Sequence, residues 1–148
     1  MEDLLFEINE TARVIRRGFD QRAAAVGVTR AQWRVMARLK REPALRQVEL
    51  AERLDMEPIT LCRIVDRLEE AGLVERKSDP SDRRVWRLEL TEKAAPLVKQ
   101  LRGIAHELAQ EATSGIEESE LISLQRRLAD IRRNLSGPGE QRGKAIRA

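Results

Sequence analysis

The chain of 148 residues has little of several residue types that mark other classes of protein. It has one cysteine, Cys62, and one histidine, His106, which excludes an internal disulfide framework and a Cys/His zinc site. One Cys and one His far apart in sequence are also a poor basis for nucleophilic catalysis. Aromatic residues make up only 3%, without any tyrosine. We therefore predict that the protein is not an enzyme and needs no cofactor or metal.

Long apolar runs are also missing from the sequence. No run approaches the roughly 18 residues of a membrane span, and the acidic start Met1-Glu2-Asp3 is unlike a signal peptide. The sequence therefore predicts a cytoplasmic protein with no membrane partner.

Charge is abundant, and its distribution is uneven. Charged residues make up 36%, against about 25% in average soluble proteins, yet the net charge is only +3. Arginines and lysines cluster between residues 13 and 41 and again between 76 and 87. Clustered arginine indicates a polyanionic partner such as double-stranded DNA, although solvated helix faces would give the same pattern.

The spacing of apolar residues predicts a mainly α-helical protein with one small β-hairpin. We expect helices at 3–25, 29–41, 47–54 and 58–71, then strands at 73–77 and 85–90 around a polar tip. Thr29 and Gln32 fit a capping box, and Pro58 suits the first turn of a helix. Thr91 is predicted to cap a further helix, which extends to about residue 112.

The last predicted helix carries a heptad seam of apolar residues, Leu121, Leu124, Leu128, Ile131 and Leu135. The composition of residues 136–148 predicts a disordered tail. The order of elements in 29–90 is that of a winged helix-turn-helix DNA-binding domain. Residues 1–28 and 91–135 would then supply the long dimerisation helices that flank it.

The helix that begins at Pro58 occupies the position that enters the major groove in a winged helix-turn-helix. Its outward residues should be Pro58, Ile59, Thr60 and Arg63, with Arg67 one turn further along. Arg63 has the geometry to contact guanine, unless it forms a surface ion pair with Asp66 or Glu70.

The hairpin tip carries Asp82, Arg83 and Arg84. An arginine on such a tip can enter the minor groove. Asp82 repels phosphate, so we expect it to brace the tip from within by accepting hydrogen bonds from Arg84 or from the backbone of the turn. An ordinary charged hairpin is the alternative.

Five stretches, at residues 28–36, 47–54, 60–74, 79–84 and 88–91, together resemble the MarR/SlyA family of bacterial transcription regulators. The resemblance covers about residues 4–135. It implies a homodimer that binds a pseudo-palindromic operator as a repressor and is released by a small aromatic or anionic ligand. It implies major-groove roles for Pro58, Ile59, Thr60 and Arg63, with Asp82 supporting the wing and Arg84 reaching the minor groove.

The sequence departs from that family at several positions. Arg46 stands where the family often has a capping Thr or Ser, so we expect it to bind phosphate, and we place Gln47 and Lys77 in the same DNA-binding set. Glu57 replaces a common Ser. No cysteine lies near the start of the first helix, so the thiol-based peroxide sensing of some relatives does not carry over.

A few residues keep two interpretations. Cys62 fits a small packing residue, with redox chemistry as the alternative, and His106 fits an ordinary helix residue. Trp33 and Met36, with Arg13 or Arg17, would line a ligand crevice, or Trp33 and Met36 belong to the core. The competing function is a winged-helix protein-interaction module without a role on DNA.

Overall fold

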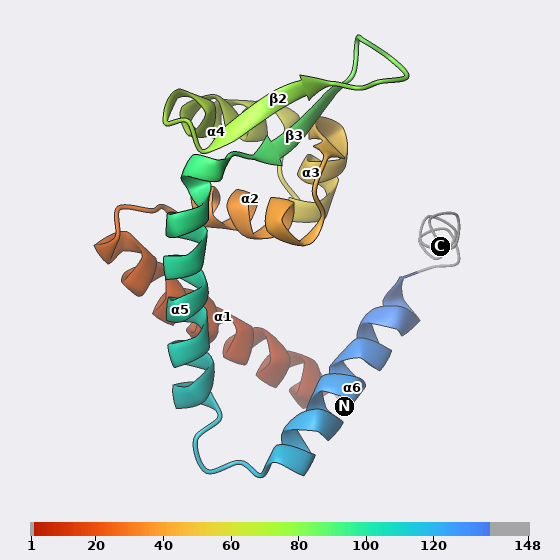
Figure 1. Ribbon diagram of the computed structural model, residues 1–148. Helices are drawn as coiled ribbons and strands as arrows, with labels where there is room; N and C mark the ends of the chain where they lie inside the picture. The colour runs from red at the N-terminus through yellow and green to blue at the C-terminus, as the bar shows by residue number, and fades with distance from the viewer. Residues whose placement is uncertain (1, 137–148) are drawn as a thin grey trace. The chain divides into compact units, whose positions relative to one another are not determined.

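The computed structural model describes residues 2–136, and Figure 1 shows the arrangement of the chain. The elements are α1 (Glu2–Ala25), α2 (Arg30–Arg41), β1 (Leu45–Arg46), α3 (Gln47–Leu54), α4 (Pro58–Glu70), β2 (Val74–Ser78), β3 (Trp86–Leu90), the short 3-10 helix η1 (Glu92–Ala94), α5 (Ala95–Ala112) and α6 (Glu118–Leu135). The prediction of a mainly α protein with a small hairpin is confirmed. The chain divides into two compact units, residues 1–109 and 110–148.

Local sequence signals explain where several helices begin and end. The Thr29 hydroxyl accepts a hydrogen bond from the Gln32 amide at 3.2 Å, and the Gln32 side chain accepts one from the Thr29 amide at 3.1 Å. This is the predicted capping box at the start of α2. Pro58 is the first residue of α4. After α4 the chain turns through Gly72 at φ +72°, a conformation that glycine adopts without a Cβ clash.

The sheet has a third strand that the sequence did not predict. Its order is β1-β3-β2 and all pairs are antiparallel, with Leu45 opposite Leu88 and Arg46 opposite Arg87. β1 has only two residues, which is too short for an alternating pattern to be visible in the sequence. Its pairing with β3 ties the loop after α2 to the base of the hairpin.

Thr91 does not have the predicted capping role. Its side chain makes no capping hydrogen bond, and its hydroxyl instead donates to the Gly72 carbonyl at 2.5 Å. The chain passes through η1 before α5 begins at Ala95. The prediction is wrong because a tertiary partner takes the hydroxyl that a helix amide would otherwise use.

The core of the first unit lies between α2, α3, α4 and the sheet. Val35, Leu50, Leu61, Val65 and Leu88 have no exposed surface. Since α4 buries Leu61, Val65 and Leu68 at steps of four and three, its opposite face is turned to solvent.

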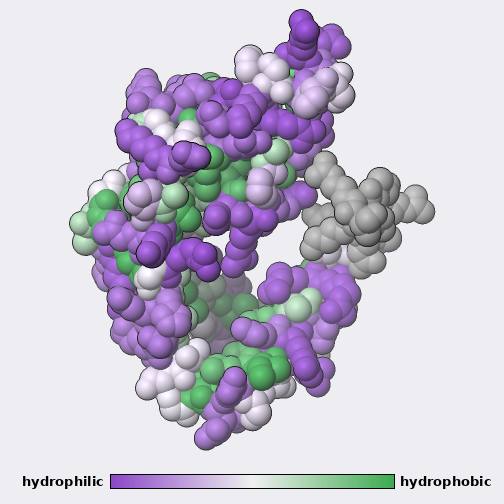
Figure 2. All heavy atoms as spheres, viewed as in Figure 1, coloured by the Kyte–Doolittle hydropathy of each residue, from purple (hydrophilic) through white to green (hydrophobic). Residues whose placement is uncertain are grey.

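In the second unit, α6 has no buried residue in the single chain, and Leu124 and Leu135 are 51% and 81% exposed. Figure 2 shows that the hairpin tip, at the top of the view, is largely hydrophilic, and that hydrophobic atoms reach the surface elsewhere on the face drawn. Of the helices described, none is long and apolar enough to cross a membrane. The predicted disordered tail lies, beyond Ser136, outside the described residues.

Candidate nucleic-acid interface

The solvent-facing side of α4 carries the residues predicted to face DNA. Pro58, Ile59, Thr60, Arg63 and Arg67 are all exposed, and Ile59 exposes 65% of its surface. An apolar side chain of this size, exposed beside a threonine and an arginine, suits contact with thymine methyls and base edges. Glu57, the N-cap residue immediately before α4, makes no side-chain capping hydrogen bond, so the first turn of α4 keeps unsatisfied amide groups.

Arg63 has no carboxylate partner in residues 2–136. Asp66, one of the two candidates, instead accepts from Arg76 Nη2 at 2.6 Å, and Arg76 Nη1 also contacts Glu69 at 2.8 Å. Arg76 reaches these carboxylates from β2, and this pairing anchors the hairpin to α4. The guanidinium of Arg63 is therefore free for an external acceptor.

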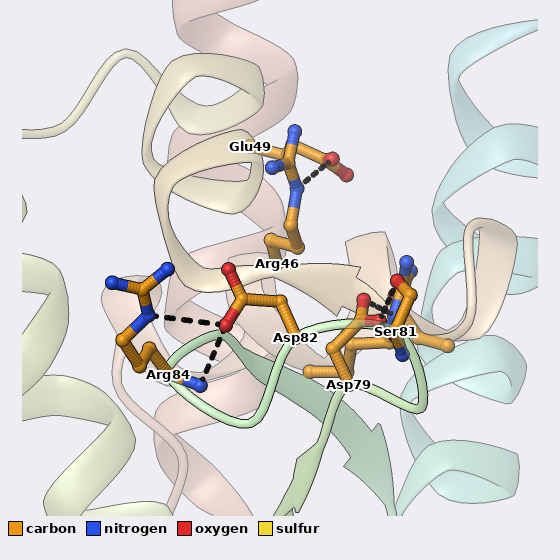
Figure 3. A network of polar contacts seen from close by, with 8 residues as sticks. Arg46, Glu49, Asp79, Ser81, Asp82 and Arg84 are labelled. Carbon is orange, nitrogen blue, oxygen red and sulfur yellow. Dashed lines mark hydrogen bonds and ion pairs between the residues drawn. The ribbon is translucent and has the colours of Figure 1, made fainter.

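The hairpin tip presents two arginines and an internal brace (Figure 3). Asp82 Oδ1 accepts from the Arg84 amide at 3.0 Å and from Arg84 Nε at 3.3 Å. The Arg84 side chain is nevertheless 92% exposed, and Arg83 is exposed too. The carboxylate thus holds the turn and leaves the outer edge of the Arg84 guanidinium open.

A second aspartate, Asp79, anchors the start of the tip, and sequence reasoning missed it. Its side chain is buried, with 5% exposure. It accepts from the Ser81 amide at 2.8 Å, the Ser81 hydroxyl at 2.6 Å and Arg87 Nε at 2.5 Å. The Ser81 hydrogen bonds and then the Arg87 guanidinium hold the pKa of Asp79 well below its usual range, against the effect of burial.

Arg87 joins this anchor to the rest of the sheet. Its Nη1 donates to the Ala44 carbonyl at 2.8 Å, just before β1. Ala44 has a φ of +60°, and the Arg87 bond helps to hold this uncommon backbone conformation. The Asp-Pro-Ser sequence at 79–81 signals a turn, but only the register of β2 and β3, with Lys77 opposite Arg87, shows that the Arg87 side chain reaches Asp79.

Of the remaining predicted DNA contacts, Arg46 and Lys77 are basic groups with internal partners. Arg46 makes no capping bond and pairs with Glu49 at 2.5 Å (Figure 3). Lys77 contacts Glu89 at 2.6 Å and Glu75 at 3.0 Å. Gln47 is partly exposed at the first position of α3. Phosphate would have to compete with carboxylates for Arg46 and Lys77, which distinguishes them from Arg63.

Cys62 lies on the side of α4 that faces β2, and it is half-buried. Its Sγ is 3.9 Å from Asp66 Oδ2 and 4.0 Å from Arg76 Nη2, so it packs beside the ion pairs that anchor the hairpin. His106 is exposed on α5. Among the residues that the structure describes, no three His, Cys, Asp or Glu side chains form a metal-binding group.

A separate cavity of about 800 Å³ opens within the first unit. Trp33 and Met36 are among its lining residues, and the ring centroids of Phe19 and Trp33 are 4.4 Å apart. Arg13 and Arg17 do not line it, and Arg13 pairs with Glu10 at 2.6 Å. Met36 also belongs to the core, with 1% exposure.

Comparison with known proteins identifies the family. The MarR family model matches residues 28–86. The solved structure of transcriptional regulator PA3341 is 34% identical, with a TM-score of 0.81, and the match covers 89% of this chain and 97% of that one. The chain belongs to the MarR family.

Two further MarR-type structures extend this likeness. The transcriptional regulator SlyA is 28% identical, with a TM-score of 0.77 over 90% of this chain and 94% of that one. A MarR variant from E. coli, solved in complex with operator DNA, is 26% identical, with a TM-score of 0.73 over 87% and 93%. The protein therefore has the winged-helix fold of the MarR transcriptional regulators, and the resemblance seen in the sequence is confirmed.

Proposed function

We propose that this MarR-family protein is a sequence-specific, DNA-binding repressor and not an enzyme. The observation that carries the proposal is the exposed face of α4, on which Arg63 lies beside Ile59 and Thr60 and has no carboxylate partner among residues 2–136. Arginine is the side chain that most often reads guanine in the major groove. Arg84 on the hairpin supplies a second cation for the minor groove or the phosphates. The binding of an E. coli MarR variant to operator DNA supports the same role.

We further propose that the protein acts as a homodimer on a pseudo-palindromic operator. The support is the apolar surface that a single chain leaves open, including Leu4 and Phe6 on α1 and Leu124 and Leu135 on α6. Exposed apolar surface of this extent marks an interaction site. Two copies would place two α4 helices on successive half-sites. The cytoplasm, where bacterial operator DNA lies, is the proposed location.

We also propose that a small aromatic or anionic effector regulates binding from the cavity that Trp33 and Met36 line. Its volume is in the range of small-molecule sites, and it combines aromatic and basic side chains.

The decisive experiment is selection of genomic fragments by the protein, followed by retarded-gel titration with the selected sequence. A shifted band that Arg63→Ala and Arg84→Ala each weaken supports the proposal. Binding that neither substitution changes contradicts the proposed interface, and failure to retain any sequence above competitor DNA favours the protein-interaction module.

A further inference from the structure

The two tryptophans of the chain, Trp33 and Trp86, lie in different surroundings. Trp33 is satisfied inside the protein, since its Nε1 donates to Asp20 Oδ1 at 3.0 Å and its ring packs on Phe19. Trp86, the first residue of β3, exposes 48% of its surface. Within residues 2–136 its Nε1 has no hydrogen-bond partner and no aromatic ring packs on it. The indole of Trp86 therefore keeps both its donor and an apolar face open.

The position of Trp86 on the hairpin explains this exposure. Side chains alternate along a strand, so Trp86 lies on the same face of the sheet as Leu88. Leu88 belongs to the core and has no exposed surface, whereas Trp86 lies one step nearer to the tip and outside the core cluster. The residue opposite Trp86 on β2 is Ser78, whose side chain is too small to cover an indole. The next residue of β2 on that face, Arg76, is held by its carboxylate partners on α4.

Trp86 also follows the two exposed arginines of the hairpin tip. Arg84 is two positions earlier, so its Cα lies no more than about 7 Å from that of Trp86. Its side chain is 92% exposed, and Arg83 is exposed as well. An apolar protein surface would have to desolvate these cations, which costs free energy, whereas a polyanion is attracted by them. A polyanion that contacts Arg84 also comes within reach of the indole.

Double-stranded DNA offers the surfaces that an open indole needs. Its deoxyribose rings are apolar, and its phosphate oxygens accept hydrogen bonds from side chains. Tryptophan combines a large apolar body with a single N–H donor, which suits a partner that is apolar at one point and polar beside it.

We propose that Trp86 is a DNA-contacting residue, which packs its ring against a deoxyribose beside the Arg84 contact and donates Nε1 to the adjoining phosphate. This contact rests on the proposed function and gives the hairpin a contribution to binding that carries no charge. Salt weakens the contribution of Arg84, because that contribution depends on counterion release, but salt does not screen the burial of apolar surface. Trp86 therefore holds the hairpin on DNA at salt concentrations at which Arg84 contributes little.

The first test is a series of gel-shift titrations at increasing salt, on DNA selected by the protein. We expect Trp86→Ala to bind about tenfold more weakly at every salt concentration, which corresponds to about 1.4 kcal/mol. The slope of log affinity against log salt should stay unchanged, because no charge is removed. Arg84→Ala is the contrasting variant, whose slope should become shallower. Trp86→Phe keeps a ring and loses only the donor, so its affinity should stay within about threefold.

The second test uses the unmodified protein, so it does not depend on how well a variant folds. Acrylamide, a neutral quencher, reaches an exposed indole more easily than a covered one. We expect selected DNA to protect part of the tryptophan fluorescence from acrylamide. Trp86→Phe is the matched control, because only Trp33 emits there, and DNA should give that variant no protection.

Three results would overturn the proposal and leave the proposed function standing. These are a Trp86→Ala affinity within about twofold of the unmodified protein, a loss of affinity that appears only as a shallower salt slope, and acrylamide quenching that DNA does not change. If Trp86→Ala keeps its DNA affinity and turns a dimer into a monomer in light scattering, the indole contacts a second copy and the proposal is wrong. If the unmodified protein retains no sequence above competitor DNA, the proposed function fails, and the Trp86 contact fails with it.

Discussion

Asp79 and Arg87 form the most buried ion pair at the hairpin, and we expect Asp79→Asn to destabilise the hairpin specifically. The substitution keeps the shape of the side chain but leaves the half-buried Arg87 guanidinium without a countercharge. Faster amide hydrogen exchange in β3 and a lower Tm are the expected results.

The pH dependence of this effect has a definite sign. The folded-state pKa of Asp79 is lowered, so its stabilisation is complete above the unfolded value of about 3.9 and is lost as the pH falls through the folded pKa. The Tm difference between the two proteins should therefore shrink on acidification below about pH 4. A difference that grows on acidification would contradict this assignment.

Cys62 lies beside the Arg76 ion pairs, and we expect it to act as a packing residue. Cys62→Ala should keep operator affinity within about tenfold, since about 1.4 kcal/mol is the scale of a modest truncation. Peroxide should have no cysteine-dependent effect on binding in a gel-shift titration. Loss of binding on oxidation that Cys62→Ala abolishes would make this thiol a sensor.

At the scale of elements, α4 and the hairpin present different chemistry to DNA, and substitutions should separate them. Arg63→Ala should cost about 1–3 kcal/mol of operator binding and relax base preference at one position in each half-site. Arg84→Ala should weaken binding to many sequences alike and reduce the salt dependence by about one counterion per protomer. Neither arginine has a partner that the fold needs, so both variants should keep the Tm. If folded Arg84→Ala keeps the operator affinity and the salt slope of the unmodified protein, Arg84 on the hairpin does not contact DNA.

Substitution of Asp82 tests whether the hairpin tip depends on the hydrogen bonds between Asp82 and Arg84. By Coulomb attraction alone, removal of a carboxylate beside DNA should strengthen binding. Asp82→Ala should instead weaken it, because the Arg84 amide and side chain lose the oxygen that orients them. Tighter operator binding by Asp82→Ala in the same titration would show that the brace is unimportant.

At the scale of the whole molecule, the open apolar surfaces predict association. Burial of one Leu or Ile side chain contributes roughly 1.5–3 kcal/mol, so several of them exceed the cost of bringing two chains together. We expect light scattering at micromolar concentration to give about 34 kDa, twice the chain mass of 16.9 kDa. Leu124→Arg should favour the monomer, whereas Glu118→Arg on the same helix serves as a charge control. A stable folded monomer of the unmodified chain would contradict the homodimer.

The sequence by itself determined the features that depend on near neighbours. The capping box at Thr29, the bounds of α3 and the outward face of α4 all follow from contacts within a few residues, where helical period and side-chain hydrogen bonds act directly. The same local logic predicted the Asp82 contact with Arg84, only two positions away.

Only the tertiary structure decided which charged groups are paired and which stay free. Arg76 forms an ion pair with Asp66, ten positions away in the sequence, so Asp66 does not pair with Arg63. Arg87 donates to the Ala44 carbonyl, 43 positions away. The cavity that Trp33 and Met36 line likewise gathers residues from α1, α2, α3 and α5. The attraction between opposite charges depends on their distance in space and not on their separation in the sequence. Their partners are therefore fixed only when packing brings the helices and strands together.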